Sequence, residues 1–268
     1  MNLSAEEKLM YAVMDAIYSS GIPIDFKGAM VLKACLMEAG FPDEIRHTAD
    51  IDANWYSDSP PSAEQLAESL GLALQKDGIN LHVALYRMYG EERSAGFELA
   101  DPDTGEILFT MDMDVNRPVQ PTQIYEVAGL RFRGVSPDQM LADKISAIST
   151  GKVFRRIKDV VDLYYLSHVF ELDLDHLQQT LSNSGKVMED FHGFLYGTEE
   201  LRHAYDKFRF TGGAEKQMVK RILGIGIPSG IENSMFQFRI KVISNIARDR
   251  RTDTGRKKRG DDGANNGE

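Results

Sequence analysis

The sequence predicts an α/β domain, built from a mixed sheet with flanking helices and followed by a helical C-terminal domain. Two capping boxes, Ser4–Glu7 and Ser62–Gln65, each stand before apolar residues that recur at helical spacing. Other segments of the first half carry apolar residues at every second position, which is typical of strands with one buried face. Beyond about residue 135 the spacing is helical throughout. This order of patterns favours one mixed domain followed by a helical one.

The N-terminal elements follow from local signals. The first helix begins after Ser4 and ends at Gly21, because glycine accepts the left-handed conformation that ends many helices. A short apolar segment over 22–26 leads into a turn at Lys27-Gly28. That turn opens a second helix, which we expect to run to about Ala39.

Strands and one further helix fill the rest of the first half. A strand carries Asp50-Ile51-Asp52, and the helix headed by Ser62 places leucines on one side. Alternation predicts strands over 81–85, 97–99 and 106–116. Between the last two, the Asp101–Gly105 segment reads as a turn, because proline presets one φ and glycine supplies a positive one.

The second half is predicted to be helical. Helices are expected over 136–151, 159–168, 174–182, 198–209, 214–223 and 232–247. The basic and glycine-rich residues of 248–268 favour a disordered tail. We therefore expect three regions: a mixed domain over 1–135, a helical domain over 136–247 that completes a cleft, and the tail.

Composition narrows the classes of protein. A net charge of −10 argues against a protein that coats nucleic acid through bulk electrostatics. The single cysteine, Cys35, excludes an internal disulfide and fits a reducing compartment. No apolar run approaches the length of a membrane span, and the N-terminus lacks the pattern of a signal peptide. The expectation is a cytoplasmic protein that does not engage a membrane.

Acidic residues on predicted strands suggest a metal site. Asp50 and Asp52 point to the same face of their strand, because successive side chains alternate. Paired carboxylates suit Mg²⁺, which takes one or two carboxylates together with substrate phosphates. Asp112 and Asp114 share one face of a later strand, and either could supply a third carboxylate. The alternative is that these carboxylates merely solvate strand ends.

A basic cluster lies in the second half of an otherwise acidic chain. Lys152, Arg155, Arg156 and Lys158 crowd a short connection between two predicted helices. Such a cluster could bind a triphosphate or an RNA backbone. A solvated loop with charges at helix ends is the competing interpretation.

Taken in order, these motifs resemble the AbiEii/AbiGii toxin family of nucleotidyltransferases. The resemblance covers roughly residues 20–170 and rests on Lys27-Gly28-Ala29, Arg46, Asp50-x-Asp52, Lys144, Arg155-Arg156 and Lys158-Asp159-x-x-Asp162-Leu163. The order and spacing of the pieces are more specific than any one of them. The C-terminal third matches only as a helical region.

The resemblance implies a nucleotidyltransferase-like fold and a set of site residues. The metal ligands would be Asp50, Asp52 and Asp114, and the catalytic residues would be these three with Lys144, Asp159 and Asp162. The nucleotide would be bound by Lys27, Gly28, Ala29, Arg46, Arg155, Arg156 and Lys158. The implied reaction is Mg²⁺-dependent transfer of a nucleoside monophosphate from an NTP to an acceptor, with tRNA as the candidate acceptor. The implied setting is toxin–antitoxin or phage defence, with a helix-turn-helix antitoxin encoded nearby.

One departure from the family pattern leaves a second interpretation open. The family turn continues with a second glycine and a hydroxyl residue, whereas this chain has Ala29 and Met30. Backbone N–H groups at a helix N-terminus can bind phosphate without a hydroxyl. The alternative is a degenerate member that binds nucleotide or a partner without transfer. A plain helical interaction protein is a third hypothesis, which the strand carboxylates weaken.

Overall fold

The computed structural model describes residues 3–41, 47–89, 94–115, 119–149, 156–167, 169–170, 173–189, 191, 198–210, 216–217 and 219–220. The chain forms two compact units. The first comprises Met1–Lys144 and Asp162–Val187, and the second comprises Ile145–Val161 and Met188–Glu268. Among the residues described, no helix combines the length and the apolar character needed to cross a membrane.

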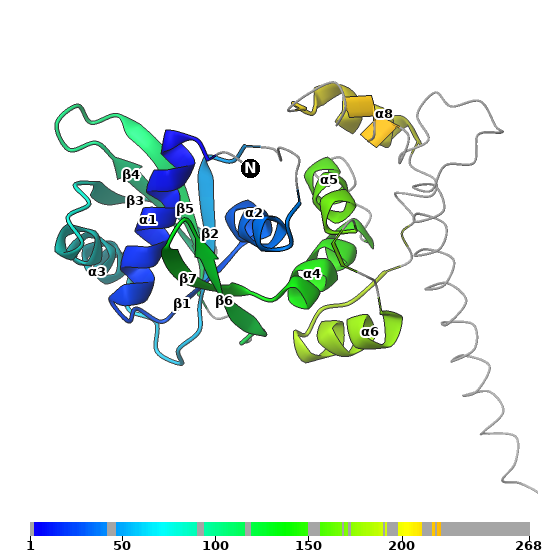
Figure 1. Cartoon of the computed structure of the whole chain (residues 1–268), viewed down its shortest axis with the longest axis horizontal. Coiled ribbons are helices and arrows are strands. Elements are labelled where there is room, and N and C mark those ends of the chain that lie inside the picture. The colour runs from blue at the N-terminus through cyan, green and yellow to red at the C-terminus, as the bar shows by residue number, and fades with distance from the viewer. Residues whose placement is uncertain are drawn as a thin grey trace, which may run out of the picture. The chain divides into compact units, whose positions relative to one another are not determined.

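The first unit is built on a mixed seven-stranded sheet of order β3-β4-β5-β2-β1-β7-β6 (Figure 1). The strands are β1 (Ile24–Lys27), β2 (Asp50–Trp55), β3 (His82–Tyr89), β4 (Ser94–Ala100), β5 (Ile107–Asp114), β6 (Thr122–Val127) and β7 (Leu130–Val135). The central strand β2 runs parallel to β5 and antiparallel to β1. The mixed sheet predicted from the alternation is confirmed.

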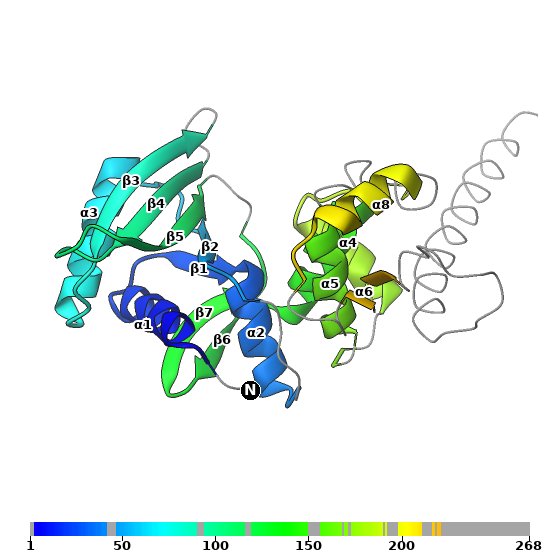
Figure 2. The same ribbon diagram turned by 90° about the horizontal axis from the view of Figure 1, so that it is seen from above.

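Three helices cover one face of this sheet, and their sequence signals explain their bounds. They are α1 (Ala5–Ser19), α2 (Gly28–Glu38) and α3 (Ala63–Lys76). Both predicted capping boxes form: Ser4 and Glu7 exchange hydrogen bonds at the start of α1, and Ser62 and Gln65 do so at α3. Figure 2 shows α1 and α3 on the same side of the strands.

The core lies between these helices and the apolar face of the sheet. Tyr11 of α1 stacks on Phe132 of β7 at 5.7 Å between ring centroids, and Phe26 of β1 meets the same ring edge-on at 6.0 Å. Val31 of α2 packs over Gly134, where a Cβ would approach it to 2.9 Å. Cys35 is buried in this core.

The opposite face of the central strands is polar. On β2 and β5 the buried residues alternate with half-exposed ones, so that Ile51 and Met111 face the core while Asp52 and Asp112 face away from it. The residue pairs of the register lie on the same side of the sheet. This alternation gathers the acidic side chains of β2 and β5 on one surface.

The hairpin of β6 and β7 was missed by the sequence reading. It closes through Ala128 and Gly129, which both have positive φ, 53° and 84°. Two consecutive positive φ values are typical of a type I′ hairpin turn, whose usual sequence is Asn-Gly. Alanine in the first position concealed that signal.

Helices follow the sheet, as predicted. They are α4 (Pro137–Ser149), α5 (Ile157–Leu166), α6 (Leu174–Asn183) and α8 (Thr198–Lys207). Most of the helix expected over 214–223, the helix over 232–247 and the tail at 248–268 lie outside the described residues. The predicted domain boundaries at 135 and 247 stay predictions.

Candidate active site

Two carboxylates face each other across the parallel strands β2 and β5. Asp52 is the register partner of Asp112, and both side chains are half-exposed on the polar face. Neighbouring strands lie about 4.8 Å apart, so these two side chains leave the sheet side by side. Paired like charges repel unless a cation lies between or beside them. The arrangement therefore suits a divalent cation.

The other two predicted metal ligands flank this pair along the strands. Asp50 is the partner of Thr110, and Asp114 is the partner of Asn54. Asp50 and Asp114 are therefore offset by four residues, about 13 Å along the strand direction. Among the described residues, no three His, Cys, Asp or Glu side chains come close enough to hold a metal. The ligand set of Asp50, Asp52 and Asp114 stays a prediction, and the register favours Asp112 beside Asp52.

Asp50 is fixed by a local contact at the start of β2. The Thr48 hydroxyl donates a hydrogen bond to Asp50 Oδ1. The predicted nucleotide ligand Arg46 lies just before this segment, outside the described residues.

The Lys27-Gly28 turn brings a helix N-terminus to Asp52. Gly28 has φ +73°, and a Cβ placed on it would lie 2.1 Å from Asp52 Oδ2. Lys27 is the N-cap of α2, and its side chain makes no capping hydrogen bond. Helix N-termini carry partial positive charge and attract phosphate groups.

The two residues after Gly28 differ in their surroundings. Ala29 is half-exposed at the start of α2, whereas Met30 is fully buried, and its carbonyl accepts a 2.9 Å hydrogen bond from the Tyr11 hydroxyl. Met30 thus extends the core at the position where the family pattern has a hydroxyl. Any phosphate contact at this turn would come from backbone N–H groups.

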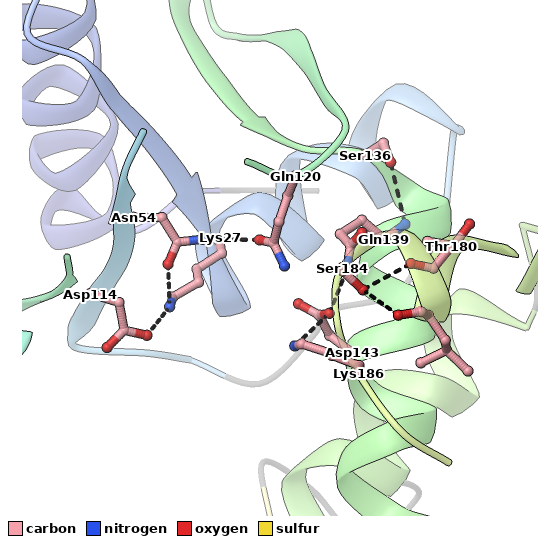
Figure 3. Close-up of polar contacts among 11 residues, drawn as sticks. Lys27, Asn54, Asp114, Gln120, Ser136, Gln139, Asp143, Thr180, Ser184 and Lys186 are labelled. Atoms are coloured by element: carbon pink, nitrogen blue, oxygen red, sulfur yellow. Dashed lines mark hydrogen bonds and ion pairs between the residues drawn. The ribbon is translucent and has the colours of Figure 1, made fainter. Parts of the chain in front are cut away.

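Lys27 itself is held by two oxygen atoms, a contact that the sequence reading did not foresee. Its Nζ lies 2.6 Å from Asp114 Oδ2 and 2.6 Å from Asn54 Oδ1. Asn54 Nδ2 donates to Gln120 Oε1 at 2.9 Å, which orients the amide oxygen toward the lysine (Figure 3). The Lys27 ammonium and the Asp114 carboxylate therefore form a hydrogen-bonded ion pair.

Asp112 also has neighbours that the sequence reading missed. The Tyr86 hydroxyl and Arg87 Nη2 of β3 each lie 3.4 Å from Asp112 Oδ1. The Tyr86 ring lies over Gly96 of β4, where a Cβ would come within 2.7 Å of the ring. Glycine within a strand signals such a close approach, so Gly96 was the available clue.

A second ion pair lies at the other end of the polar face. Arg133 of β7 pairs with Asp25 of β1, and its guanidinium lies 3.7 Å from the centre of the Tyr56 ring. Burial raises the pKa of the Asp25 carboxyl, and the neighbouring Arg133 opposes that rise. This pair fixes the β1–β7 end of the face.

The helical segments contribute two further pairs of predicted residues. Lys144 Nζ lies 2.7 Å from Asp162 Oδ2, and Asp162 is fully buried. In the second unit, Arg156 Nη1 lies 3.4 Å from Asp159 Oδ2 across the start of α5. The first pair joins two predicted catalytic residues.

Two residues of the predicted basic loop can be placed from the described structure. Lys158 is exposed on the first turn of α5, and the buried Nε of Arg156 has no hydrogen-bond partner among the described residues. Arg155 and Lys152 lie outside those residues. Their predicted role in binding nucleotide stays a prediction.

Comparison with known proteins identifies a family and structures of similar fold. The family model for the nucleotidyl transferase AbiEii toxin of type IV toxin–antitoxin systems matches residues 16–220. MenT4, a nucleotidyltransferase toxin from Mycobacterium tuberculosis H37Rv, is similar in structure, with a TM-score of 0.51 and 11% identity over 87% of this chain and 86% of that one. An antigenic nucleotidyltransferase-like protein from Paracoccidioides brasiliensis has a TM-score of 0.45 and 17% identity over 68% of this chain and 88% of that one. No curated protein matches in sequence.

The likeness to MenT4 shows the fold, and the family match covers most of the chain. The segment that the family model matches contains every strand of the sheet, the Lys27-Gly28 turn and the carboxylates of the polar face. The resemblance read from the motifs is therefore confirmed. The chain belongs to the family of AbiEii nucleotidyl transferase toxins of type IV toxin–antitoxin systems.

Proposed function

We propose that this protein is an active, Mg²⁺-dependent nucleotidyltransferase that transfers a nucleoside monophosphate from an NTP to tRNA. The observation that carries the proposal is the pairing of Asp52 with Asp112 on adjacent parallel strands, beside the N-terminus of α2. Family membership supports the reaction class. It also implies an antitoxin partner, for which we propose a helix-turn-helix protein encoded nearby.

The side chains present fit Mg²⁺. Its preferred ligands are oxygen atoms, and it commonly binds through one or two carboxylates while substrate phosphates and water complete the shell. Asp52 and Asp112 would supply those carboxylates, with Asp50 next along the face, whereas Asp114, the third predicted ligand, is hydrogen-bonded to Lys27. A bound ion would neutralise charge on the triphosphate during phosphoryl transfer.

The chain's own groups would position the nucleotide. The backbone N–H groups that open α2 would receive phosphate oxygens, because Gly28 lets the helix end approach Asp52 closely. The predicted phosphate contacts from Lys144 and Lys158 would add positive charge. Of these, Lys144 is already bound to Asp162, so its first role is to hold that buried carboxylate.

Labelled NTPs and purified tRNA provide the test. With Mg²⁺ present, the protein should label tRNA, and chelation of the metal should abolish the signal. Asp52→Asn and Asp112→Asn should each reduce kcat/KM by about 100-fold or more, because a metal ligand is worth several kcal/mol in the transition state. Asp103→Asn, in an exposed turn, is the matched control and should behave as wild type. Full activity in both site variants would refute the assignment.

One observation favours a second candidate, nucleotide binding without transfer. Met30 is buried where the family pattern has a hydroxyl residue, so this turn lacks one phosphate contact. In that case the protein would bind NTP in a calorimetric titration with Mg²⁺, yet it would label no RNA. Labelling of any acceptor would exclude this candidate.

A further inference from the structure

The Lys27 ammonium lies between the Asp114 carboxylate and the Asn54 amide oxygen, in a position that a metal ion could otherwise take. Lys27 is the last residue of β1, and its register partner on β2 is Asp52. Its side chain therefore leaves the sheet on the polar face, in the row that contains Asp52 and Asp112. Strand pairing on both sides of β2 fixes this arrangement, so it does not depend on a loop.

The atoms that bind the ammonium are those that a hard cation prefers. Asp114 Oδ2 and Asn54 Oδ1 each lie 2.6 Å from Lys27 Nζ. One is a carboxylate and the other an amide carbonyl, and both are common ligands of divalent ions in proteins. Gln120 accepts from Asn54 Nδ2, so the amide oxygen must face Lys27 (Figure 3).

Burial strengthens this pair. The Lys27 and Asp114 side chains are 23% and 24% exposed. Charges in a partly desolvated position attract each other more strongly than exposed charges do. A competing ion would have to displace a cation that is tethered to the backbone and hydrogen-bonded on two sides.

We propose that the Lys27 ammonium is a built-in cation of this active site. It occupies the position between Asp114 and Asn54, so that Asp114 is not a ligand of the divalent ion, and the nucleotide-free protein binds one such ion at Asp52 and Asp112. Two-metal sites clamp both reacting oxygens of a phosphoryl group. Here the tethered ammonium supplies one of those positive charges. This inference refines, and rests on, the proposed function.

Counting bound Mn²⁺ tests the inference without any measurement of activity. Mn²⁺ accepts the same oxygen ligands as Mg²⁺ and can be counted by electron paramagnetic resonance. Lys27→Met empties the position while keeping an unbranched side chain, so it should bind one Mn²⁺ more per chain than wild type. Lys27→Arg keeps the charge and should bind the wild-type number. Circular dichroism confirms that each variant is folded.

The double variant Lys27→Met/Asp114→Asn removes both charges of the pair and keeps the charge balance of the face. It should lose the added ion and return to the wild-type number, with an affinity within about threefold of wild type, a difference below about 0.7 kcal/mol. The same count in Lys27→Met as in wild type would overturn the inference. So would a double variant that binds fewer ions than wild type, because Asp114 would then be a ligand in the native protein.

These comparisons separate the inference from the proposed function. Asp52→Asn should remove the ion that wild type binds, and retention of that ion would count against the metal site of the proposed function. The gain in Lys27→Met is measured relative to wild type, whatever number wild type binds. A gain therefore supports the role of Lys27 even if tRNA is not labelled.

Discussion

The Asp52 carboxylate lies against the backbone of Gly28. A Cβ built on Gly28 would be 2.1 Å from Asp52 Oδ2 and 2.9 Å from Asp52 Cγ. Gly28 also has φ +73°, a backbone conformation that residues other than glycine adopt only with strain. The turn and the carboxylate thus constrain each other: the residue that opens α2 must be glycine for Asp52 to keep its place.

Gly28→Ala should therefore disturb both stability and metal binding. Left-handed backbone costs about 1–2 kcal/mol for alanine, and the steric overlap should add about 1–3 kcal/mol unless Asp52 moves away. We expect a lower free energy of unfolding in urea and weaker Mn²⁺ binding.

Gly21→Ala is the matched control for this variant. Gly21 also has φ +73°, but nothing lies within 4 Å of the position that a Cβ would take there. Gly21→Ala should lose only the stability that the left-handed backbone conformation costs alanine, and it should bind Mn²⁺ as wild type does. Equal Mn²⁺ affinity in both variants would contradict the link between Gly28 and Asp52.

Lys144→Met should destabilise the protein because it removes the ammonium that lies 2.7 Å from the buried Asp162 carboxylate. Asp162 is fully buried, and removing one member of a buried pair costs about 3–5 kcal/mol. The double variant Lys144→Met/Asp162→Asn removes the charge as well and should lose less stability than Lys144→Met alone. A double-mutant cycle needs four proteins: wild type, Lys144→Met, Asp162→Asn and the double variant. Chemical denaturation measures the free energy of unfolding of each.

The cycle also helps to interpret any loss of transfer in these variants, because it measures how much the ion pair contributes to stability. A coupling energy near zero would mean that Lys144 and Asp162 do not stabilise each other in solution. In that case the loss of this ion pair would not explain a loss of transfer in Lys144→Met.

Much of the fold could be predicted because strong local signals agree with it. The capping boxes at Ser4 and Ser62 fixed two helix starts, and alternation located the strands that carry Asp52 and Asp112. The β6–β7 hairpin was missed because Ala128 stands in a turn position that usually holds asparagine or glycine. There, tertiary pairing overrides a weak local preference.

The site was harder to predict because its geometry depends on strand register. Alternation shows that Asp112 and Asp114 share a face, yet it cannot say which of them is opposite Asp52. The register pairs Asp112 with Asp52 and leaves Asp114 to Lys27. Lys27 was assigned to nucleotide from the family pattern alone, because a contact between residues so far apart in sequence has no local signature.

Acid should weaken the contact between α1 and α2. Glu7 of α1 and Lys33 of α2 form a buried pair, with 2.5 Å between Oε1 and Nζ. Burial acts to raise the pKa of Glu7, but the hydrogen bonds from Lys33 and the Ser4 backbone N–H, with the nearby His47, outweigh it and hold the pKa below its ordinary value of 4.5. The stabilisation is thus complete above about pH 4.5 and is lost as the pH falls through the lowered pKa.

Urea unfolding from pH 7 to pH 3 measures this effect. Glu7→Gln should be less stable than wild type by about 3–5 kcal/mol at pH 7, because the Lys33 charge stays buried without its carboxylate. The difference between the two proteins should shrink as the pH falls below 4.5, the ordinary pKa of the group. Parallel stability curves would show that Glu7 does not titrate with unfolding.

Ala128→Asn should stabilise the β6–β7 hairpin. Ala128 has φ 53°, which strains alanine, whereas asparagine accepts this conformation and commonly precedes glycine in type I′ turns. We expect a gain of about 0.5–1 kcal/mol in the free energy of unfolding, measured by urea denaturation at neutral pH. Gly129→Ala is the reciprocal control: at φ 84° it should cost stability even though nothing lies within 4 Å of its Cβ position. No gain in the first variant, or no loss in the second, would show that the turn adopts another conformation in solution.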